Sequence, residues 1–252
     1  MAEKLEFTTR HQFHPLIEKR DRWLRIQDQE SSRGRFDQLV GPHWASQNWA
    51  LQGSLQRVTS PKPSSSHHRD ERLARHELAA RQMVDWAQSL ESLSSTHLLE
   101  LHQLLSTGSS TGKSRFREND IASICEAHEP IEAELVPAVV ENALQWFQAE
   151  SFHQMHEIER TALVLTKLVD IHPFGEANGI TVRLISNFSL LRAGYPPAIL
   201  SPLKADAYAL AIENAIRFHT QPLVDLLAEA AHETLCICLG EPPPPPTLKV
   251  IG

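Results

Sequence analysis

The sequence is poor in features that mark particular classes of protein. It has only three cysteines, Cys125, Cys236 and Cys238, and the last two lie too close together for an ordinary disulfide framework. It contains no run of about 18 uncharged apolar residues, so no transmembrane helix is expected. Residues 1–10 are charged and lack the apolar segment of a signal peptide. These absences favour a cytoplasmic protein with reduced thiols, and an exported effector would show the same pattern.

An excess of basic residues is missing as well. The 24 Lys and Arg residues are outnumbered by 31 Asp and Glu residues, and the formal net charge is −7. Nucleic-acid-binding proteins usually present a basic face, so neither nucleic acid nor a membrane is an expected partner. Hydrophobic residues make up 41% of the chain, which supports an ordinary buried core.

Apolar residues recur at helical spacing along most of the chain, without an alternation of strands and helices. The pattern predicts an all-α bundle of about eight helices. Ser95 or Thr96 is the expected N-cap of one helix, and Gly194 suits the C-terminal end of another. The expected ranges are Phe13–Gln27, His43–Leu55, Leu73–Ala87, Ser95–Leu105, Pro137–Phe147, Met155–Val169, Ile180–Arg192, Asp206–Phe218 and Pro222–Cys236.

Composition divides the chain into three parts. Residues 1–69 form an expected N-terminal helical segment that ends in the Ser- and Pro-rich linker Ser60–His68. Residues 70–239 form the expected helical core. Residues 240–252 contain five consecutive prolines, and we expect this tail to be extended, exposed and disordered.

The segment His172–Arg183 (HPFGEANGITVR) interrupts two helical stretches of this core. Pro173 disfavours helix at the residue before it, and Asn178-Gly179 suits a tight turn into the next helix. The free N–H groups at that helix N-terminus would favour an anion. Arg183 lies about one turn into the helix and can point back toward the same space. The segment therefore has the elements of a phosphate site.

Two more side chains of this segment fit phosphate chemistry. Glu176 could hold a magnesium ion that bridges phosphate oxygens. His172, on the other side of the turn, could take a proton from an incoming hydroxyl group. The same residue types also occur in helix–helix turns for structural reasons alone, so the composition of the turn leaves both interpretations open.

The segment resembles the signature of the Fic family, His-x-Phe-x-Asp/Glu-Gly/Ala-Asn-Gly/Lys-Arg-x-x-Arg. The matching residues are His172, Phe174, Glu176, Ala177, Asn178, Gly179 and Arg183. Segments around the signature also resemble the family; they are Gly112–Arg115, His156–Asp170, Leu190–Pro197 and Lys204–Leu210. The similarity spans residues 70–227, so residues 70–239 are expected to form a Fic-type catalytic core with its short β-hairpin flap.

The resemblance implies a transferase that moves AMP from ATP onto a Ser, Thr or Tyr hydroxyl of a target protein. It implies these roles: His172 as general base, Glu176 as ligand of Mg²⁺, Ala177, Asn178 and Gly179 around the α- and β-phosphates, Arg183 at the terminal phosphates, and Phe174 as a buried anchor. The target would dock on the flap within Arg115–Glu129 by adding an extended segment to the hairpin. A homo-oligomer is compatible with the sequence.

One position departs from the signature. Ile180 stands where the family pattern has its first arginine, which removes a positive charge worth about 1.5–3 kcal/mol at a phosphate. Lys113, Arg115 or Lys204 could replace it. Three functions stay open: a weak AMP transferase, an enzyme that transfers another phosphate-containing group, as in phosphorylation or phosphocholination, and a non-catalytic Fic-like scaffold.

Upstream, the segment Asn48–Ser54 (NWALQGS) resembles the inhibitory helix of one Fic subgroup, whose pattern is Ser/Thr-x-x-x-Glu-Gly/Asn. In that helix the glutamate pairs with the second arginine of the signature. Here Gln52 takes its place, and a neutral amide can hydrogen-bond Arg183 but cannot form an ion pair with it. The alignment predicts a weakened inhibitory contact. The alternative is an ordinary amphipathic helix that packs its tryptophans inward.

Overall fold

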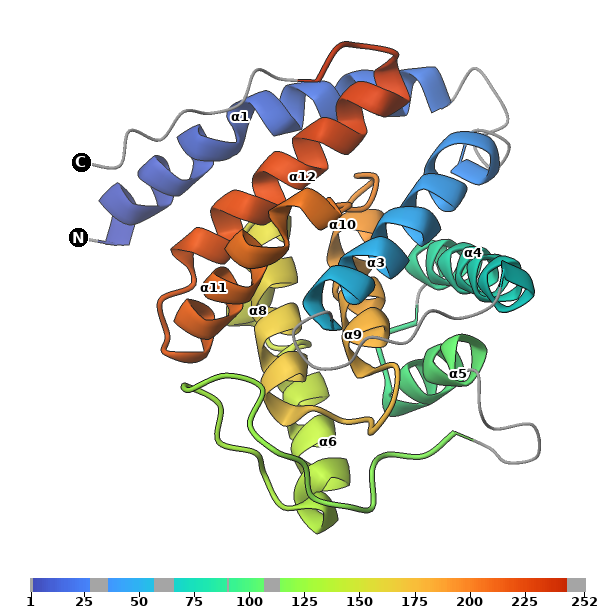
Figure 1. Ribbon diagram of the computed structural model, residues 1–252. Helices are drawn as coiled ribbons and strands as arrows, with labels where there is room; N and C mark the ends of the chain where they lie inside the picture. Colours follow the sequence, from blue (N-terminus) through green and yellow to red (C-terminus); the bar gives the residue numbers. More distant parts are fainter. Residues whose placement is uncertain (1, 28–35, 57–65, 90, 107–113, 244–252) are drawn as a thin grey trace.

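The computed structural model describes the chain except for residues 1, 28–35, 57–65, 90, 107–113 and 244–252 (Figure 1). Throughout the described ranges the regular structure is helical and no strand occurs. The α-helices are α1 (Ala2–Gln27), α3 (Gly41–Gln56), α4 (Ser66–Gln88), α5 (Ser95–Leu105), α6 (Val136–Trp146), α7 (Glu150–His153), α8 (Glu157–Ile171), α9 (Asn178–Ser186), α10 (Phe188–Arg192), α11 (Ala205–Ile216) and α12 (Gln221–Leu239). Shorter helical turns are η1 (Phe36–Val40), η2 (Ala133–Leu135) and η3 (Pro202–Lys204).

Helix α8 lies at the centre of the bundle, in contact with α6, α9, α10, α11 and α12 (Figure 1). It begins after His156, whose Nδ1 accepts the N–H of Ile158 at 3.2 Å, while the Glu159 carboxylate accepts the N–H of His156 at 3.0 Å. These bonds satisfy N–H groups that a helix start leaves free. Eight of its residues are buried, so the helix is apolar around most of its circumference, as the sequence predicts.

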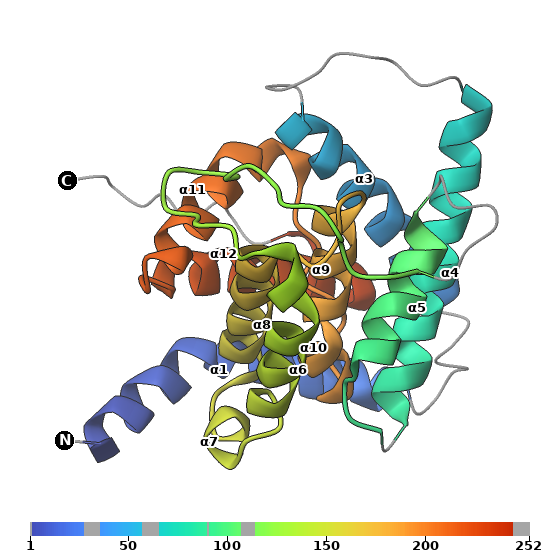
Figure 2. The same ribbon diagram turned by 90° about the horizontal axis from the view of Figure 1, so that it is seen from below.

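The prediction of a β-hairpin flap is wrong. The described residues 114–132 form a loop without strands along one side of α8 and α9 (Figure 2). Side chains satisfy much of its backbone. The N–H of Ile124 donates to His128 Nδ1 at 3.2 Å, and the N–H of Ala133 donates to Asp120 Oδ1 at 2.8 Å. The carbonyls of Asn119 and Ile131 accept hydrogen bonds from Arg117. Backbone groups used in this way cannot form a ladder between the two limbs.

Other differences from the predicted helices are local, although together they make the expected number of helices too low. The range Ile180–Arg192 divides into α9 and α10 at Asn187, whose side chain donates to the Arg183 carbonyl at 2.9 Å and accepts the N–H of Ala198 at 2.7 Å. Ser94, one residue before the expected cap, accepts the N–H of His97 at the start of α5. Gly194 follows α10 with a φ of 81°, a conformation that suits a helix end.

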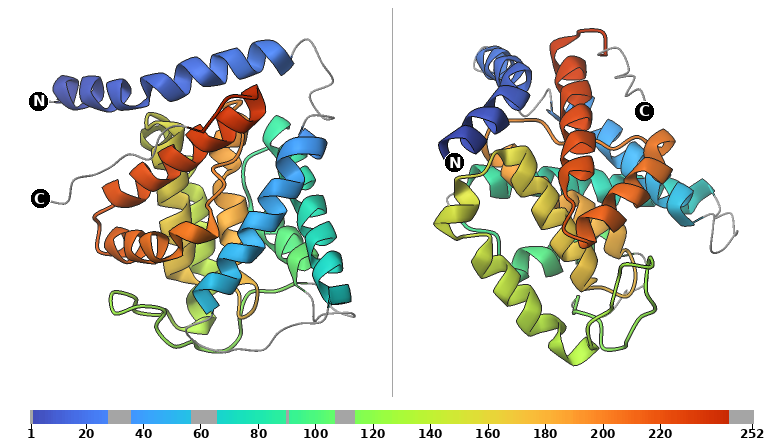
Figure 3. Two further views of the ribbon diagram at one scale, coloured as in Figure 1. Left: turned by 45° about the horizontal axis from the view of Figure 1, so that its top comes forward. Right: turned by 90° about the vertical axis from the view of Figure 1, so that its left-hand side faces the viewer.

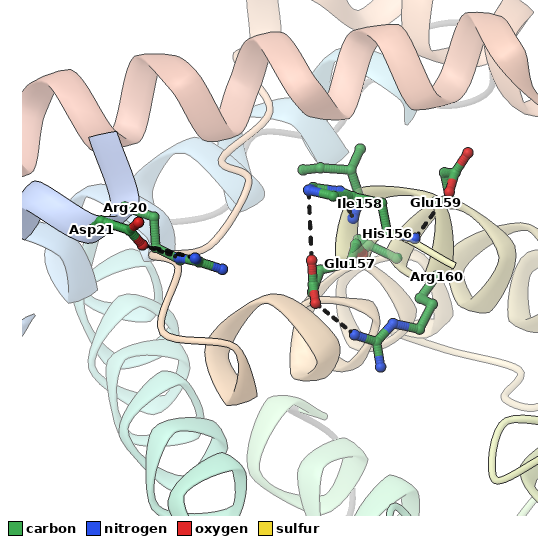
Figure 4. A network of polar contacts seen from close by, with 8 residues as sticks. Arg20, Asp21, His156, Glu157, Ile158, Glu159 and Arg160 are labelled. Atoms are coloured by element: carbon green, nitrogen blue, oxygen red, sulfur yellow. Dashed lines mark hydrogen bonds and ion pairs between the residues drawn. The ribbon is translucent and has the colours of Figure 1, made fainter. Parts of the chain in front are cut away.

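Helix α1 crosses the outside of the bundle and packs on α12 (Figures 1 and 3). Phe13 stacks on His156 at 4.0 Å between ring centroids, and the Arg20 guanidinium lies over the Tyr195 ring at 5.0 Å. At the same end of α8, the Glu157 carboxylate accepts from Arg160 at 2.9 Å and lies 3.6 Å from His156 (Figure 4). This polar network fixes the end of α8 that lies farthest along the helix from His172.

Helices α3, α4 and α9 pack against one another, with α3 in contact with both others. Trp44 and Leu51 are buried in the core from α3, whereas Trp49 is only partly buried, so the amphipathic interpretation of this helix holds for two of its three inward residues. The boundaries of the N-terminal segment and core stay a prediction, and most of the linker Ser60–His68 and of the Pro-rich tail lies outside the described residues. None of the helices described is both long and apolar enough to cross a membrane.

Candidate functional site

The signature segment makes a tight turn between α8 and α9. His172 closes α8 with a φ of 51°, and Ala177 opens α9 with a φ of 52°. Residues other than glycine rarely adopt this left-handed conformation, and such strained residues cluster at functional sites. Phe174 is fully buried beneath the turn, and its N–H donates to Asn178 Oδ1 at 3.1 Å. The turn is therefore fixed by its own side chains.

The N-terminus of α9 has unpaired N–H groups of the kind that favour an anion. No side chain caps this helix, and its first internal bond joins the N–H of Thr181 to the Ala177 carbonyl at 3.0 Å. The N–H groups of the residues before Thr181 therefore lack partners within the helix. Gly179 lies in this first turn, and a Cβ there would come within 3.0 Å of Arg183 Nη1 and 2.7 Å of Gln52 Oε1. Glycine thus keeps open the space that both side chains enter.

Arg183 is buried, with 5% of its surface exposed, and its guanidinium is turned toward α3. Its Nε donates to Asn48 Oδ1 at 2.6 Å, and its Nη2 donates to the Asn48 carbonyl at 3.3 Å and to Gln52 Oε1 at 3.0 Å. The guanidinium also lies 5.9 Å from the centre of the Tyr208 ring. Burial lowers the pKa of Arg183. No carboxylate in the described part of the chain pairs with it.

A second buried arginine holds the backbone of the proposed base. Arg117 comes from the loop 114–132, and its side chain is 2% exposed. Its Nε donates to the His172 carbonyl at 2.9 Å, and its backbone N–H donates to the Pro173 carbonyl at 2.9 Å. Its two remaining nitrogens donate to carbonyls of Asn119 and Ile131. Arg117 therefore ties both limbs of the loop to the turn that carries His172.

His172 is half-buried and its ring is held close to a second histidine. Burial, helped by His128 and Arg117, lowers the pKa of His172 to about 4. The His128 ring lies 6.4 Å away; its Nδ1 accepts the N–H of Ile124, so its Nε2 donates to the Asp170 carbonyl at 2.9 Å. His172 Nδ1 is buried and has no hydrogen-bond partner. The His172 imidazole is therefore neutral near pH 7, the form that can accept a proton.

Glu176 lies exposed at the tip of the turn, next to the N-terminus of α9. His102 supports it from α5: its Nε2 contacts the Glu176 carbonyl at 3.0 Å, and its ring stacks on Phe174 at 4.0 Å. The described residues contain no cluster of three metal-binding side chains. One free carboxylate beside an anion site nevertheless fits Mg²⁺, which commonly binds through one or two carboxylates and phosphate oxygens.

The position of the missing arginine faces the interior. Ile180 is 1% exposed and belongs to the hydrophobic core. Lys204 forms ion pairs with Glu229 and Glu233 on α12, and the exposed Arg115 pairs with Glu118. Lys113 lies outside the described residues. Among the cations that the structure describes, Arg183 is therefore the one that meets the N-terminus of α9.

The geometry thus brings Gln52 to Arg183, as the alignment of α3 with an inhibitory helix predicts. The supporting residues were not among those predicted from the sequence; they are Asn48, His76, His102, Arg117 and His128. Asn48 stands at the Ser/Thr position of the inhibitory pattern, which was a usable signal. The histidines and Arg117 carry no signal in sequence, because their contacts span up to 74 residues of chain.

A family model described as the Fic/DOC family matches residues 92–190. A protein adenylyltransferase Fic from Drosophila ananassae is 37% identical over 95 residues, which make up 38% of this chain and 19% of that protein. This chain therefore matches only about a fifth of the length of that curated relative.

Solved structures share the fold. Fic-1 from C. elegans superposes with a TM-score of 0.75 at 21% identity, covering 94% of this chain and 73% of that one. IbpAFic2, solved in complex with adenylylated Cdc42, gives a TM-score of 0.52 at 19% identity, covering 75% and 62% of the two chains. With the signature geometry, these likenesses lead to one conclusion: residues 92–190 match the Fic/DOC family model, and the chain has the fold of solved Fic proteins.

Proposed function

We propose that this protein is an adenylyltransferase that moves AMP from ATP onto a hydroxyl group of a target protein. The proposal extends to this chain the activity in the name of the Drosophila ananassae relative. It also fits IbpAFic2, which was captured with an adenylylated protein. The cytoplasm stays the expected compartment, consistent with three cysteines that form no disulfide with one another.

The observation that carries the proposal is the buried, unneutralised guanidinium of Arg183. All its described hydrogen-bond partners are neutral: oxygens of Asn48 and Gln52, and the Tyr208 side chain. A buried charge without a counterion is costly, so a site of this kind favours an anion that can enter it. The open N-terminus of α9 faces the same space and adds N–H donors. Together they suit the phosphates of a nucleotide.

The proposed reaction requires one proton transfer and one substitution at phosphorus. His172 takes the proton of the target hydroxyl, and the oxygen forms a bond to the α-phosphorus of ATP. The bond from that phosphorus to the bridging oxygen breaks, and pyrophosphate leaves. The low pKa of His172, about 4, keeps the ring ready to accept a proton at neutral pH. General-base help of this kind contributes about 10²–10⁴ in rate.

The other signature residues orient the nucleotide. Asn178 holds the turn, while the backbone of Ala177 and Gly179 and the Arg183 side chain bind phosphates. Mg²⁺, held by Glu176, would supply charge neutralisation at the phosphate oxygens. The lack of a positive charge at Ile180 favours a slow enzyme, because a charge-assisted bond to phosphate contributes about 1.5–3 kcal/mol.

A docking site for the target lies beside the loop 114–132. A groove of about 420 Å³ runs between the start of this loop and the start of α6. Its lining includes Phe116 and Arg117, and Arg117 also holds the His172 carbonyl. An extended target segment in this groove would lie next to the base. This docking replaces strand addition to a hairpin, since residues 114–132 form no strand.

The test uses ATP labelled at the α- or the γ-phosphate, Mg²⁺, and a lysate as the source of targets. We expect label from the α position on protein, dependent on His172, so that His172→Ala reduces labelling by about 10²-fold or more. The exposed histidine variant His219→Ala is the control and should label like the wild type.

Each alternative function predicts a different pattern of label. Label from the γ position alone would identify phosphorylation and contradict AMP transfer. Equal labelling by wild type and His172→Ala would remove the histidine from the mechanism. Binding of ATP without any histidine-dependent label, with phosphocholine donors tried in parallel, would leave the chain a non-catalytic scaffold.

A further inference from the structure

The buried contact between α3 and Arg183 continues beyond α3 into α4. Asn48 Nδ2 lies 2.8 Å from Nε2 of His76, and His76 is fully buried at 0% exposure. The same Asn48 nitrogen donates to the Ile180 carbonyl at 3.3 Å. A continuous chain of hydrogen bonds therefore joins α4, α3 and α9 through His76, Asn48 and Arg183.

The direction of every bond in this chain is fixed by Arg183. A guanidinium can only donate, so the Asn48 atom that faces Arg183 Nε at 2.6 Å must be the oxygen. The amide nitrogen then faces His76 and must donate to its Nε2. His76 is consequently the neutral tautomer with its proton on Nδ1, which has no hydrogen-bond partner. Burial and the charge of Arg183 lower the pKa of His76 to about 3, so this tautomer persists at neutral pH.

The two α3 residues that contact Arg183 differ in exposure and in the atoms they bind. Asn48 is 5% exposed, and its side-chain oxygen accepts from Nε, which Gln52 does not contact. Gln52 is partly exposed, and its Oε1 lies 2.7 Å from the Cβ position that Gly179 leaves open. A phosphate at the N-terminus of α9 would therefore meet Gln52 and displace its flexible amide. The bond from Asn48 to Nε is made by a buried side chain and would remain.

We propose that His76 is a positioning residue that, through Asn48, keeps Arg183 aimed at the phosphate site, while Gln52 is the partner that a nucleotide displaces. The inference rests on the proposed function for the identity of the ligand, and it deepens the regulation of that site. Two residues of α3 that contact the same arginine therefore have opposite effects. Loss of Gln52 should strengthen nucleotide binding, whereas loss of the His76–Asn48 bond should weaken it.

Two variants with opposite expected effects test this division. His76→Phe removes the nearer of the two acceptors of Asn48 Nδ2 and leaves the 3.3 Å bond to the Ile180 carbonyl, so the amide is held less firmly and can turn its nitrogen toward Arg183. We expect ATP with Mg²⁺ to bind roughly 10-fold more weakly, because one oriented hydrogen bond to a charged group is lost. Gln52→Ala should bind ATP a few-fold more tightly, since a competing acceptor is removed. Titration calorimetry measures both affinities.

Two controls separate positioning from general damage. His76→Gln offers a side-chain oxygen to Asn48 and should recover most of the lost ATP affinity. AMP lacks the terminal phosphates assigned to Arg183, so its affinity should be about the same in wild type and His76→Phe. Equal weakening of ATP and AMP, or no recovery in His76→Gln, would contradict the proposal and indicate a purely structural histidine.

A readout without nucleotide keeps this inference distinguishable from the proposed function. The Nε–H of Arg183 should be protected from exchange with solvent in the wild type and in His76→Gln, and exposed to exchange in His76→Phe. NMR of labelled arginine side chains measures this exchange. Lost protection in His76→Phe together with no ATP binding by wild type would support the positioning role and reject the nucleotide site. Unchanged protection and unchanged ATP affinity in His76→Phe would overturn the positioning role.

Discussion

Two buried arginines hold this domain together in different ways. Arg117 donates to three backbone carbonyls, those of His172, Asn119 and Ile131. Arg183 donates mainly to side-chain oxygens of Asn48 and Gln52. A backbone carbonyl has little freedom to leave its donor, whereas a side chain can rotate away. The comparison distinguishes a permanent structural clamp from a cation whose partner can be exchanged for a ligand.

The two arginines also differ in how their charge is balanced. Arg117 has the Asp120 carboxylate at 3.8 Å, so its charge is partly balanced within the loop. Arg183 has no such partner among the described residues and relies on neutral oxygens. Each arginine also lies beside a neutral histidine whose pKa it helps to lower, His172 for Arg117 and His76 for Arg183. A clamp near the proposed base and an exchangeable cation at the proposed phosphate site divide the site into two parts.

Removal of each arginine gives the largest expected effects and tests the comparison directly. Arg183→Gln should weaken ATP binding by roughly 30- to 700-fold, corresponding to about 2–4 kcal/mol for a lost charge contact, with little change in stability. Arg117→Leu should instead lower the free energy of unfolding by roughly 3 kcal/mol or more, because buried carbonyls lose their donor. Calorimetry for ATP and urea denaturation measure the two quantities.

Arg217→Gln is the matched control for both arginine variants. This arginine is exposed and pairs with Glu213, and surface ion pairs contribute about 0–1 kcal/mol. We expect neither ATP affinity nor stability to change appreciably. The distinction between the two buried arginines would collapse if Arg183→Gln unfolded the protein and Arg117→Leu left its stability intact.

A negative charge at position 52 should weaken ATP binding through the same arginine, by less than the loss of Arg183 itself. In Gln52→Glu the carboxylate would replace an amide oxygen that lies 3.0 Å from Arg183 Nη2, converting a neutral contact into an ion pair. We expect ATP affinity to fall by about 10-fold, since hydrogen bonds to charged groups are stronger by about 1–1.5 kcal/mol. Gln88→Glu, an exposed change of the same type on α4, is the control. Equal or tighter ATP binding in Gln52→Glu would refute the inhibitory role of this contact.

Much of the arrangement around Arg183 was accessible from sequence. The apolar periodicity of α8 and the turn residues between α8 and α9 predict a buried helix that stops and restarts at the signature. The alignment of Asn48–Ser54 with an inhibitory helix predicts the contact between Gln52 and Arg183, which the structure contains at 3.0 Å. These features are local or rest on long motifs, so they can be predicted without knowledge of the tertiary packing.

The surroundings of Arg117 could not be predicted in the same way. The family resemblance predicts a hairpin within the loop 114–132, yet Arg117 and His128 bind its backbone and no ladder forms. Nothing in the spacing of Arg117 shows that it reaches His172, 55 positions along the chain. The burial of Ile180 likewise depends on α3, which lies more than a hundred residues earlier. Tertiary contacts determine the conformation of the loop and the burial of Ile180, and the periodicity of the sequence contains no information on such contacts.

The smallest expected effect concerns pH and the clamp side of the site. The pKa of His172 is lowered to about 4, so its neutral form persists as pH falls through the usual value of 6.5 and is lost only near pH 4. The His172-dependent labelling rate should therefore stay level from about pH 8 to pH 5 and decline below that. His128→Gln removes one group that lowers this pKa, so the acid limb should move to slightly higher pH, whereas Gln52→Ala should leave it in place. An acid limb centred near pH 6.5 in the wild type would show that the base is solvated and that Arg117 and His128 do not tune it.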